Sequence, residues 1–365
     1  MNSNQRLRIQ VTRPLDSAGI DVLDGDARMS LIGFIPELLQ DLNCDPLVVL
    51  ENANIDRALF DDNSASVSFS KACELLEASA KTTGAPHFGL LMGERFTLSL
   101  LGVVEQLMCY SNTVHEAILQ LIRHLHINDR GAVVYLIEYN HDEVALGYSV
   151  FTNKLPGLAQ LFDYSMSNAY TILQHLCGTA WRPKRIMFAH STPQNLTPYQ
   201  NQFNALLYFD APRTEIVFAK HYLANSIKSA DYSSRILAER AAFGSDISSG
   251  QLLQSVRRTI HILLLTGHAS SLMVSKHLGI NERVLRRHLN KAGTSIKQMK
   301  TVIRMNLACQ LLGMTDLSLQ DIASHLGYSD ATAFSRAFRK QQSVTPINYR
   351  ILASESFNHN NAETA

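Results

Sequence analysis

The stretch that decides the fold is residues 317–350, LSLQDIASHLGYSDATAFSRAFRKQQSVTPINYR, together with a shorter counterpart at residues 271–290, SLMVSKHLGINERVLRRHLN. Both contain His-Leu-Gly, at 277–279 and at 325–327. In each, a short segment with helical apolar spacing precedes the glycine and a second one follows it. The pattern predicts two copies of a helix, a tight turn and a second helix, which is the helix-turn-helix arrangement.

Each copy supplies the apolar residues that this arrangement requires. The first helix needs an apolar face with a small residue at the helix crossing, and the matching residues are Val274, Ser275 and Leu278, then Ile322, Ala323 and Leu326. The second helix needs apolar anchors, and we expect these to be Val284, Leu285 and Leu289, then Phe334 and Phe338. Both copies can therefore bury one face of each helix against a common core.

The residues in the turns and at the starts of the second helices also fit the helix-turn-helix arrangement. Gly279 and Gly327 can adopt the positive φ that a tight turn between helices demands. Asn281 and Ser329 follow them and have the short polar side chains that cap a helix N-terminus. We therefore predict that these two residues cap the second helices.

The side chains left facing outward on the second helices are polar and mostly cationic. In the first copy they are Asn281, Glu282, Arg283, Arg286, Arg287, Asn290 and Lys291. In the second copy they are Ser329, Asp330, Thr332, Ser335, Arg336, Arg339 and Lys340. Arg can read guanine in the major groove, Asn can read adenine, and Lys and Ser usually meet phosphates. These residues form the predicted DNA-binding site, although helical phase alone leaves open which of them touch bases.

A long amphipathic helix is predicted between the two copies, over residues 295–312. Its apolar positions follow a 3-4-4-4 spacing and are Ile296, Met299, Ile303, Leu307 and Leu311. Five turns of helix span roughly 27 Å. Such a helix would hold the two units about one DNA turn apart, so that one chain reads two successive major grooves.

These motifs closely resemble the AraC/XylS family of transcription regulators. The matching positions are Ile322-Ala323, Leu326-Gly327-Tyr328, Phe334-Ser335-Arg336-Ala337-Phe338, Thr345-Pro346 and Tyr349-Arg350. In the first copy, residues 285–289 and 293–295 resemble the variant found in members with a long N-terminal domain. The sequence departs from the family at Ser343, where Gly is usual, and at Ser275, where Ala is usual.

The N-terminal part is similar to the long, non-cupin sensor-type domain of one subgroup, which includes regulators of ornithine use. The similar segments are 90–95, 101–102, 111–117 and 181–186. The resemblance implies a transcription regulator, by family habit an activator, that is controlled by a small-molecule effector. The expected partners are double-stranded promoter DNA, RNA polymerase and a second copy of the chain in a homodimer. Nothing in these residues assigns the effector or the residues that bind it.

Length and charge predict two domains. Residues 251–352 carry fourteen Lys or Arg against four Asp or Glu, a net charge of +10, whereas the whole chain of 365 residues carries only +1. A basic module on an acidic body suits a phosphate-binding domain joined to a sensor. We therefore expect an α+β sensor and dimerisation domain over residues 1–224, a linker region over 225–251, an all-α DNA-binding domain over 252–352 and a flexible tail over 353–365.

The predicted N-terminal fold mixes helices with a small sheet. Helical spacing occurs in residues 28–45, 67–81, 100–126 and 158–176, and Asn112 or Thr113 can cap a helix within the third of these ranges. Segments rich in β-formers at 132–138 and 143–151 predict a hairpin, and 185–189, 205–209 and 214–218 predict three short strands. Within the linker region a helical piece is expected over residues 236–243.

Other features point away from catalysis, metals and membranes. The chain has no run of about 18 apolar residues, no apolar signal core at its start and no Walker, GxGxxG, HExxH or GxSxG motif, so we expect a cytoplasmic protein without catalytic residues or cofactor. The pair His124 and His126 lacks further ligands and predicts a helix-end pair rather than a metal site. Cys73, Cys109 and Cys177 fall within predicted helices, so each is expected to be a buried small apolar residue.

Two alternatives remain at this stage. One is an effector-independent or architectural DNA-binding protein, and the other is an enzyme tethered to DNA, against which the missing catalytic motifs count. Trp181 is expected in the core rather than against a ligand. Arg182, Lys184 and Arg185 either hold an effector carboxylate or form a solvated strand edge.

Overall fold

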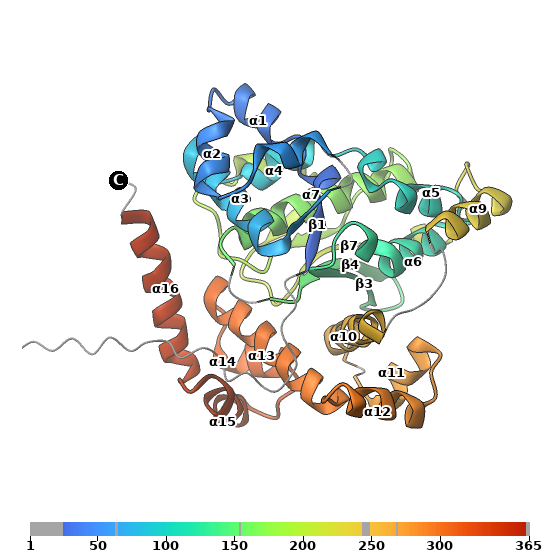
Figure 1. Cartoon of the computed structure of the whole chain (residues 1–365), viewed down its shortest axis with the longest axis vertical. Helices are drawn as coiled ribbons and strands as arrows, with labels where there is room; N and C mark the ends of the chain where they lie inside the picture. The colour runs from blue at the N-terminus through green and yellow to red at the C-terminus, as the bar shows by residue number, and fades with distance from the viewer. Residues whose placement is uncertain (1–24, 63–64, 153–154, 243–248, 268, 363–365) are drawn as a thin grey trace, which may run out of the picture.

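The computed structural model describes residues 25–62, 65–152, 155–242, 249–267 and 269–362. Two separate apolar cores organise these residues: one draws on residues 27–223 and the other on residues 256–338. The first belongs to a mixed α/β domain and the second to an all-helical domain, as the sequence predicts (Figure 1).

The N-terminal domain is built around a five-stranded sheet. The strand order is β3-β4-β7-β5-β6, and all neighbouring pairs are antiparallel except β5 with β6. The strands are β3 (Ala132–Glu138), β4 (Glu143–Val150), β5 (Arg185–Met187), β6 (Leu206–Tyr208) and β7 (Thr214–Ala219). The predicted hairpin and all three predicted short strands are confirmed.

Helices surround this sheet and a small second one, which pairs β1 (Asp26–Arg28) with β2 (Ser66–Ser68). The α-helices are α1 (Ile35–Asp41), α2 (Pro46–Asn52), α3 (Phe69–Thr83), α4 (Phe88–Glu94), α5 (Val103–Cys109), α6 (Val114–His124), α7 (Leu158–Cys177), α8 (Thr197–Gln202) and α9 (Tyr232–Ala242). Short 3-10 helices cover Met29–Leu31, Arg57–Asp61, Leu98–Leu101, Leu125–Ile127 and Lys220–Ala224.

Helix boundaries follow their caps. Thr113 caps α6 by accepting a hydrogen bond from the backbone N–H of Glu116, which confirms one of the two predicted caps. The predicted helix from residue 67 begins two residues later, at Phe69, because Ser68 caps it by accepting from the N–H of Lys71. Val67 instead pairs with Ala27 in the small sheet.

Helices α4 and α7 approach each other closely because α4 presents glycine to α7. A Cβ atom at Gly89 would lie 2.0 Å from the backbone oxygen of Gln160. We expect Gly89→Ala to lower the free energy of unfolding by about 1–3 kcal/mol, since the backbone of α7 cannot give way cheaply. Urea denaturation followed by far-UV circular dichroism, which reports on the helices of both domains, measures this. The matched control is Gly313→Ala, where the new Cβ would meet only the Ala353 Cβ at 3.6 Å; an equal loss there would exclude close packing as the cause.

The C-terminal domain contains seven helices within the described residues. They are α10 (Ser249–Leu265), α11 (Ser271–Leu278), α12 (Glu282–Lys291), α13 (Ile296–Met314), α14 (Leu319–His325), α15 (Ala331–Gln342) and α16 (Pro346–Ala362). Helix α16 includes residues 353–362, which the sequence assigns to a flexible tail. The reason is that no Gly or Pro follows Pro346 to end the helix.

The linker region also contains more structure than predicted. Helix α9 begins at Tyr232, four residues before the predicted start, and packs on α5. The N–H of Asp231 donates to the carbonyl of Tyr110, and Arg235 pairs with Glu116 at 3.3 Å. Residue 243, the predicted end of this helical piece, lies outside the described residues.

The sheet separates the two halves of the molecule. Helix α7 packs on the β4 and β7 strands from the N-terminal side, whereas α10 of the C-terminal domain packs on β3. Figure 1 shows α7 above the sheet and α10 below it. Strand β4 therefore presents alternate side chains to the two halves.

Candidate DNA-binding interface

The first helix-turn-helix unit consists of α11, a turn at Gly279 and α12. Val274 and Ser275 are buried on α11, and Gly279 adopts φ +63° as predicted. Asn281 caps α12 by accepting from the N–H of Arg283, which confirms its predicted role. The hydroxyl of Ser275, where the family usually has Ala, donates to the carbonyl of Ser271 at 3.0 Å, so its burial leaves no unmet donor.

The second unit consists of α14, a turn at Gly327 and α15. Gly327 adopts φ +72°, and Phe334 and Phe338 are fully buried. The predicted cap was wrong by one residue. Asp330 caps α15 by accepting from the N–H of Ala333 at 2.7 Å, while the Ser329 hydroxyl donates to the carboxylate of Asp330. Both Ser and Asp cap well, and here the backbone begins its helical turn after Asp330.

The predicted DNA-binding residues lie together on the free faces of α12 and α15. All of them are exposed except Glu282 and Ser335, which are half-buried. Figure 1 shows both helices at the end of the molecule that lies away from the N-terminal domain. Val284 was predicted as a core anchor, but it is half-buried and lines an open surface hollow. The rest of that lining is Arg283, Arg286, Arg287, Asn290 and Lys291.

Few of these cations are neutralised inside the protein. Of these DNA-facing cations, only Arg286 forms an ion pair within the described part of the chain, a loose contact of 3.9 Å with Glu282 one turn earlier. Arg336 lies near Asp330 and adds to the lowering of that carboxyl's pKa, which is caused first by the cap hydrogen bond from Ala333. The remaining guanidinium and ammonium groups are free to meet phosphates and base edges.

Helix α13 holds the two units apart. It spans nineteen residues, or about 28 Å, and Met299, Ile303, Leu307 and Leu311 on its apolar face are buried as predicted. At its far end, Arg350 donates hydrogen bonds to the carbonyls of Leu312 and Leu317. These contacts hold α16 against the end of α13 and the segment that leads into α14.

Ser343 ends α15 in a left-handed conformation, φ +61°, where glycine is the usual residue. We expect Ser343→Gly to raise the free energy of unfolding by about 1 kcal/mol, because a side chain is strained in that conformation. Thermal or urea denaturation checks this. Ser324→Gly, at an exposed helical position of α14, is the matched control and should lower stability by about as much. Destabilisation by both variants would show that Ser343 is not strained.

The other candidates from the sequence are structural. His124 ends α6 and His126 lies in the next 3-10 helix, which confirms a helix-end pair; burial lowers the pKa of each to about 4. Trp181 is fully buried in the core. Lys184 and Arg185 both pair with Glu143, at 3.1 and 3.0 Å.

The remaining candidate residues also have structural positions. Arg182 donates to the carbonyls of Thr179 and Trp181. The cysteines Cys73, Cys109 and Cys177 lie on helices as predicted. No group of three or more metal-binding side chains occurs in the part of the chain that the structure describes.

A set of contacts that sequence reasoning missed docks the C-terminal domain on β4 and the residues after it. Ser149 and His261 of α10 share a hydrogen bond of 2.8 Å between Oγ and Nε2. Asn306 of α13 donates to the carbonyl of Phe151 at 2.9 Å, and Gln310 donates to those of Val150 and Thr152. The sequence does contain a signal for this docking, because Asn306 and Gln310 are polar residues one turn apart on a helix with an apolar stripe.

The docking surface is closely packed as well as hydrogen-bonded. The guanidinium of Arg257 lies 4.5 Å from the ring centroid of Phe151, and the ring of His261 lies 5.3 Å from the same centroid. Burial lowers the pKa of His261 to about 3, with the nearby Arg257 adding to the effect. The imidazole is therefore neutral at pH 7 where it meets Ser149.

An α/β domain docked on an all-helical domain with two helix-turn-helix units defines a DNA-binding transcription regulator. Residues 44–227 match the family model "Arabinose-binding domain of AraC transcription regulator, N-term", and residues 274–351 match "Helix-turn-helix domain". The chain belongs to the AraC family of transcription regulators, and the resemblance drawn from the sequence is confirmed.

Named relatives are similar along most of the chain. The Ornithine utilization regulator of Pseudomonas aeruginosa is 26% identical over 86% of this chain and 93% of its own. The HTH-type transcriptional regulator VirS of Mycobacterium tuberculosis is 26% identical with the same coverage. The crystal structure of the transcriptional regulator CdpR from P. aeruginosa covers 86% of this chain and 97% of its own, at 21% identity and a TM-score of 0.41. No helix among the described residues is long and apolar enough to cross a membrane.

Proposed function

We propose that this chain controls transcription by binding a specific promoter sequence through α12 and α15, under the control of a small-molecule effector held by the N-terminal domain. The observation that carries the proposal is the pair of free cationic faces at the two ends of α13. The length of α13, about 28 Å, approaches one turn of DNA, roughly 34 Å, so α12 and α15 can each enter one of two successive major grooves.

Effector control is supported by the docking of the two domains. Hydrogen bonds join α10 and α13 to the end of β4, and β4 belongs to the sheet of the N-terminal domain. A molecule that changes this sheet would alter how the C-terminal domain is held. An effector acts in this way only as far as it binds the two arrangements with different affinity.

The family resemblance supports three further parts of the proposal. Activation is the habit of the family, and activation requires contact with RNA polymerase. We also propose that the chain acts as a homodimer through its N-terminal domain. Analytical ultracentrifugation of the full chain, with and without promoter DNA, tests the dimer; a monomer under both conditions would contradict it.

The decisive experiment is fluorescence anisotropy of the full chain with DNA from its own gene neighbourhood and with shuffled DNA, at two salt concentrations. We expect tighter binding to one natural fragment than to its shuffled form, and a loss of affinity with salt because phosphate contacts release counterions. Equal affinity for natural and shuffled fragments across the neighbourhood would contradict sequence-specific regulation.

The rival is a DNA-binding protein without an effector. It predicts that affinity for the operator is the same with every metabolite tested, and that no metabolite raises the melting temperature of the full chain. A ligand that binds only the folded protein raises that temperature by mass action. Ornithine, which the name of one relative mentions, belongs in this screen beside uncharged compounds.

A further inference from the structure

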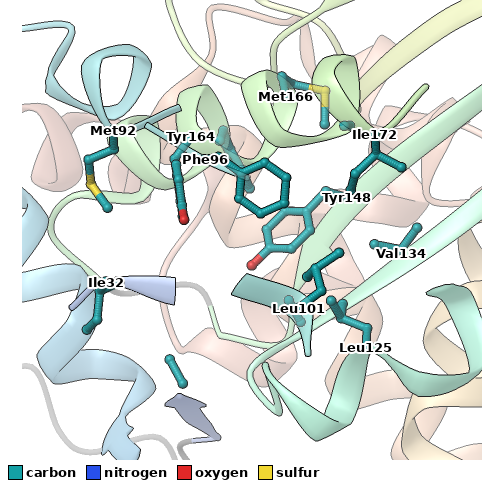
Figure 2. Close-up of a cluster of buried hydrophobic side chains, with 14 of the residues drawn as sticks. Ile32, Met92, Phe96, Leu101, Leu125, Val134, Tyr148, Tyr164, Met166 and Ile172 are labelled. Atoms are coloured by element: carbon teal, nitrogen blue, oxygen red, sulfur yellow. The ribbon is translucent and has the colours of Figure 1, made fainter. Parts of the chain in front are cut away.

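The N-terminal domain contains a cavity of about 90 Å³ between α7, α3 and one face of the five-stranded sheet. Apolar side chains converge on it from α7 (Met166, Ile172), from the sheet (Val134) and from the 3-10 helices (Leu101, Leu125), as Figure 2 shows. The cavity is large enough for several water molecules, yet its lining gives water few partners. An apolar hollow of this kind in a well-packed core is the default place for a small ligand.

The few polar groups in the lining set the chemistry of the ligand. Asp129 already accepts from the Tyr148 hydroxyl at 2.7 Å and from the N–H of Gly131 at 2.8 Å. The Oδ1 atom of Asn168 is buried and has no hydrogen-bond partner among the described residues. None of the described residues that line the cavity is Lys, Arg or His. Asn168 Oδ1 can therefore accept a hydrogen bond from a ligand, whereas no cationic side chain in the lining can neutralise a carboxylate.

We propose that this cavity takes the effector, and that the effector is a small, neutral, mostly apolar molecule with a hydroxyl or N–H group that donates to Asn168. This inference rests on the proposed function, in which an effector acts through the N-terminal domain. Under this proposal the effector is neither a charged amino acid such as ornithine nor a sugar. A zwitterion would lose its hydration here without gaining a partner for its carboxylate.

The volume implies that binding displaces the walls. An engineered apolar cavity of about 150 Å³ binds benzene, so 90 Å³ is too small for an aromatic ring without adjustment. The ring of Tyr148 lines the cavity and packs edge-to-face on Phe162, with the ring centroids 6.4 Å apart. A ligand of ring size must move such side chains, and Tyr148 belongs to β4.

Strand β4 connects this cavity to the DNA-binding domain. Tyr148 lines the cavity, and the next residue, Ser149, points to the other face and bonds to His261 of α10. The carbonyls of Val150 and Phe151 then accept from Gln310 and Asn306 of α13. A ligand that displaces Tyr148 would therefore also move the next three residues, which make the contacts that hold α10 and α13.

The first test uses the full chain and five probes. Phenol, benzyl alcohol and indole are neutral, mostly apolar donors, whereas ornithine and arabinose are the charged and the polar comparison. We expect at least one of the three donors, near ten times its Kd, to raise the melting temperature by about 3–5 °C, and ornithine and arabinose to have no effect. A shift with ornithine or arabinose alone, or no shift with the three donors, would overturn the proposal.

Variants assign the binding to the cavity. Ala169→Leu on α7 and Ala72→Val on α3 enlarge side chains that line the cavity, and each should abolish the shift. Asn168→Leu should weaken phenol binding by roughly 3- to 10-fold and leave toluene binding unchanged, because toluene has no donor. Tyr148→Phe removes a hydroxyl in the lining, and its matched control is Tyr135→Phe, which removes a buried hydroxyl on the other face of the sheet. Unchanged phenol binding in folded Ala169→Leu and Ala72→Val would place the site elsewhere.

DNA affinity provides the second, independent readout. The bound probe should change the affinity of the full chain for its operator, and the change should disappear in Ala169→Leu. Binding of the probe without any change in DNA affinity would overturn the coupling through β4. Failure of the unliganded chain to select natural over shuffled DNA would instead contradict the proposed function, whatever the cavity binds.

Discussion

Alanine at position 286 or 336 is expected to weaken binding to the cognate DNA by about 1–3 kcal/mol, or roughly 5- to 150-fold. Arg286 lies on the exposed face of α12 and Arg336 on that of α15, and neither is tied into the core. A bidentate contact from such a guanidinium to guanine is lost completely when the side chain is truncated, whereas binding to shuffled DNA loses only a nearby charge.

The measurement is anisotropy on cognate and shuffled duplexes for wild type, Arg286→Ala, Arg336→Ala and Lys228→Ala. Lys228 is exposed in the linker region, so its removal changes the net charge equally without touching α12 or α15. Specific readout predicts a large loss for the two Arg variants on cognate DNA only. Equal losses on both duplexes would show that the two arginines meet phosphates, and losses no larger than that of Lys228→Ala would remove them from the interface.

Truncation of Phe338 to alanine is expected to lower the free energy of unfolding of the C-terminal domain by about 3–5 kcal/mol. The ring is fully buried on α15 and meets Phe334 and Tyr349 at 5.7 and 5.5 Å between centroids. Its loss leaves a cavity between α15 and α16 that the stiff neighbouring rings cannot fill. The second recognition helix would then lose its support, and DNA affinity would fall with stability.

Two optical signals separate this effect by domain. Trp181 is the only tryptophan and is buried in the N-terminal core, so its fluorescence follows that domain, while far-UV circular dichroism follows the helices of both. We expect Phe338→Ala to shift the dichroism transition in urea to lower concentration much more than the fluorescence transition. Phe338→Leu keeps most of the volume and should cost far less. Equal stability of Phe338→Ala and wild type would mean that this core is not built as described.

The C-terminal domain could be predicted well from sequence because its rules are local. Positive φ requires glycine at Gly279 and Gly327, an apolar stripe defines α13, and caps mark where each helix begins. Within the two helix-turn-helix units the errors are of one residue or one side chain: Asp330 rather than Ser329 is the cap, and Val284 is half-buried rather than in the core. Neighbouring residues that cap equally well cannot be separated without the backbone.

In the N-terminal domain, the features that depend on contacts between distant segments could not be predicted from local sequence patterns. The strands were predictable from their β-forming residues, but the order β3-β4-β7-β5-β6 depends on pairing between segments some 70 residues apart. The cavity and the docking contacts depend on side chains such as Asn168, His261 and Gln310, which have no shared motif. Only the folded chain brings them together, so the DNA-binding residues could be proposed from sequence and the cavity could not.

The docking bonds of α13 end on main-chain carbonyls. Asn306 and Gln310 supply the side chains, and residues 150–152 supply only backbone oxygens, which every amino acid carries. The side chains of Val150 and Thr152 can therefore change in evolution while the hydrogen bonds persist, whereas the ring of Phe151 also packs on Arg257 and His261. A DNA-binding module that keeps its own Asn and Gln can be combined with sensors of very different sequence, provided that each offers a strand end at the same place. Exchange of whole sensors between relatives is then a short evolutionary step.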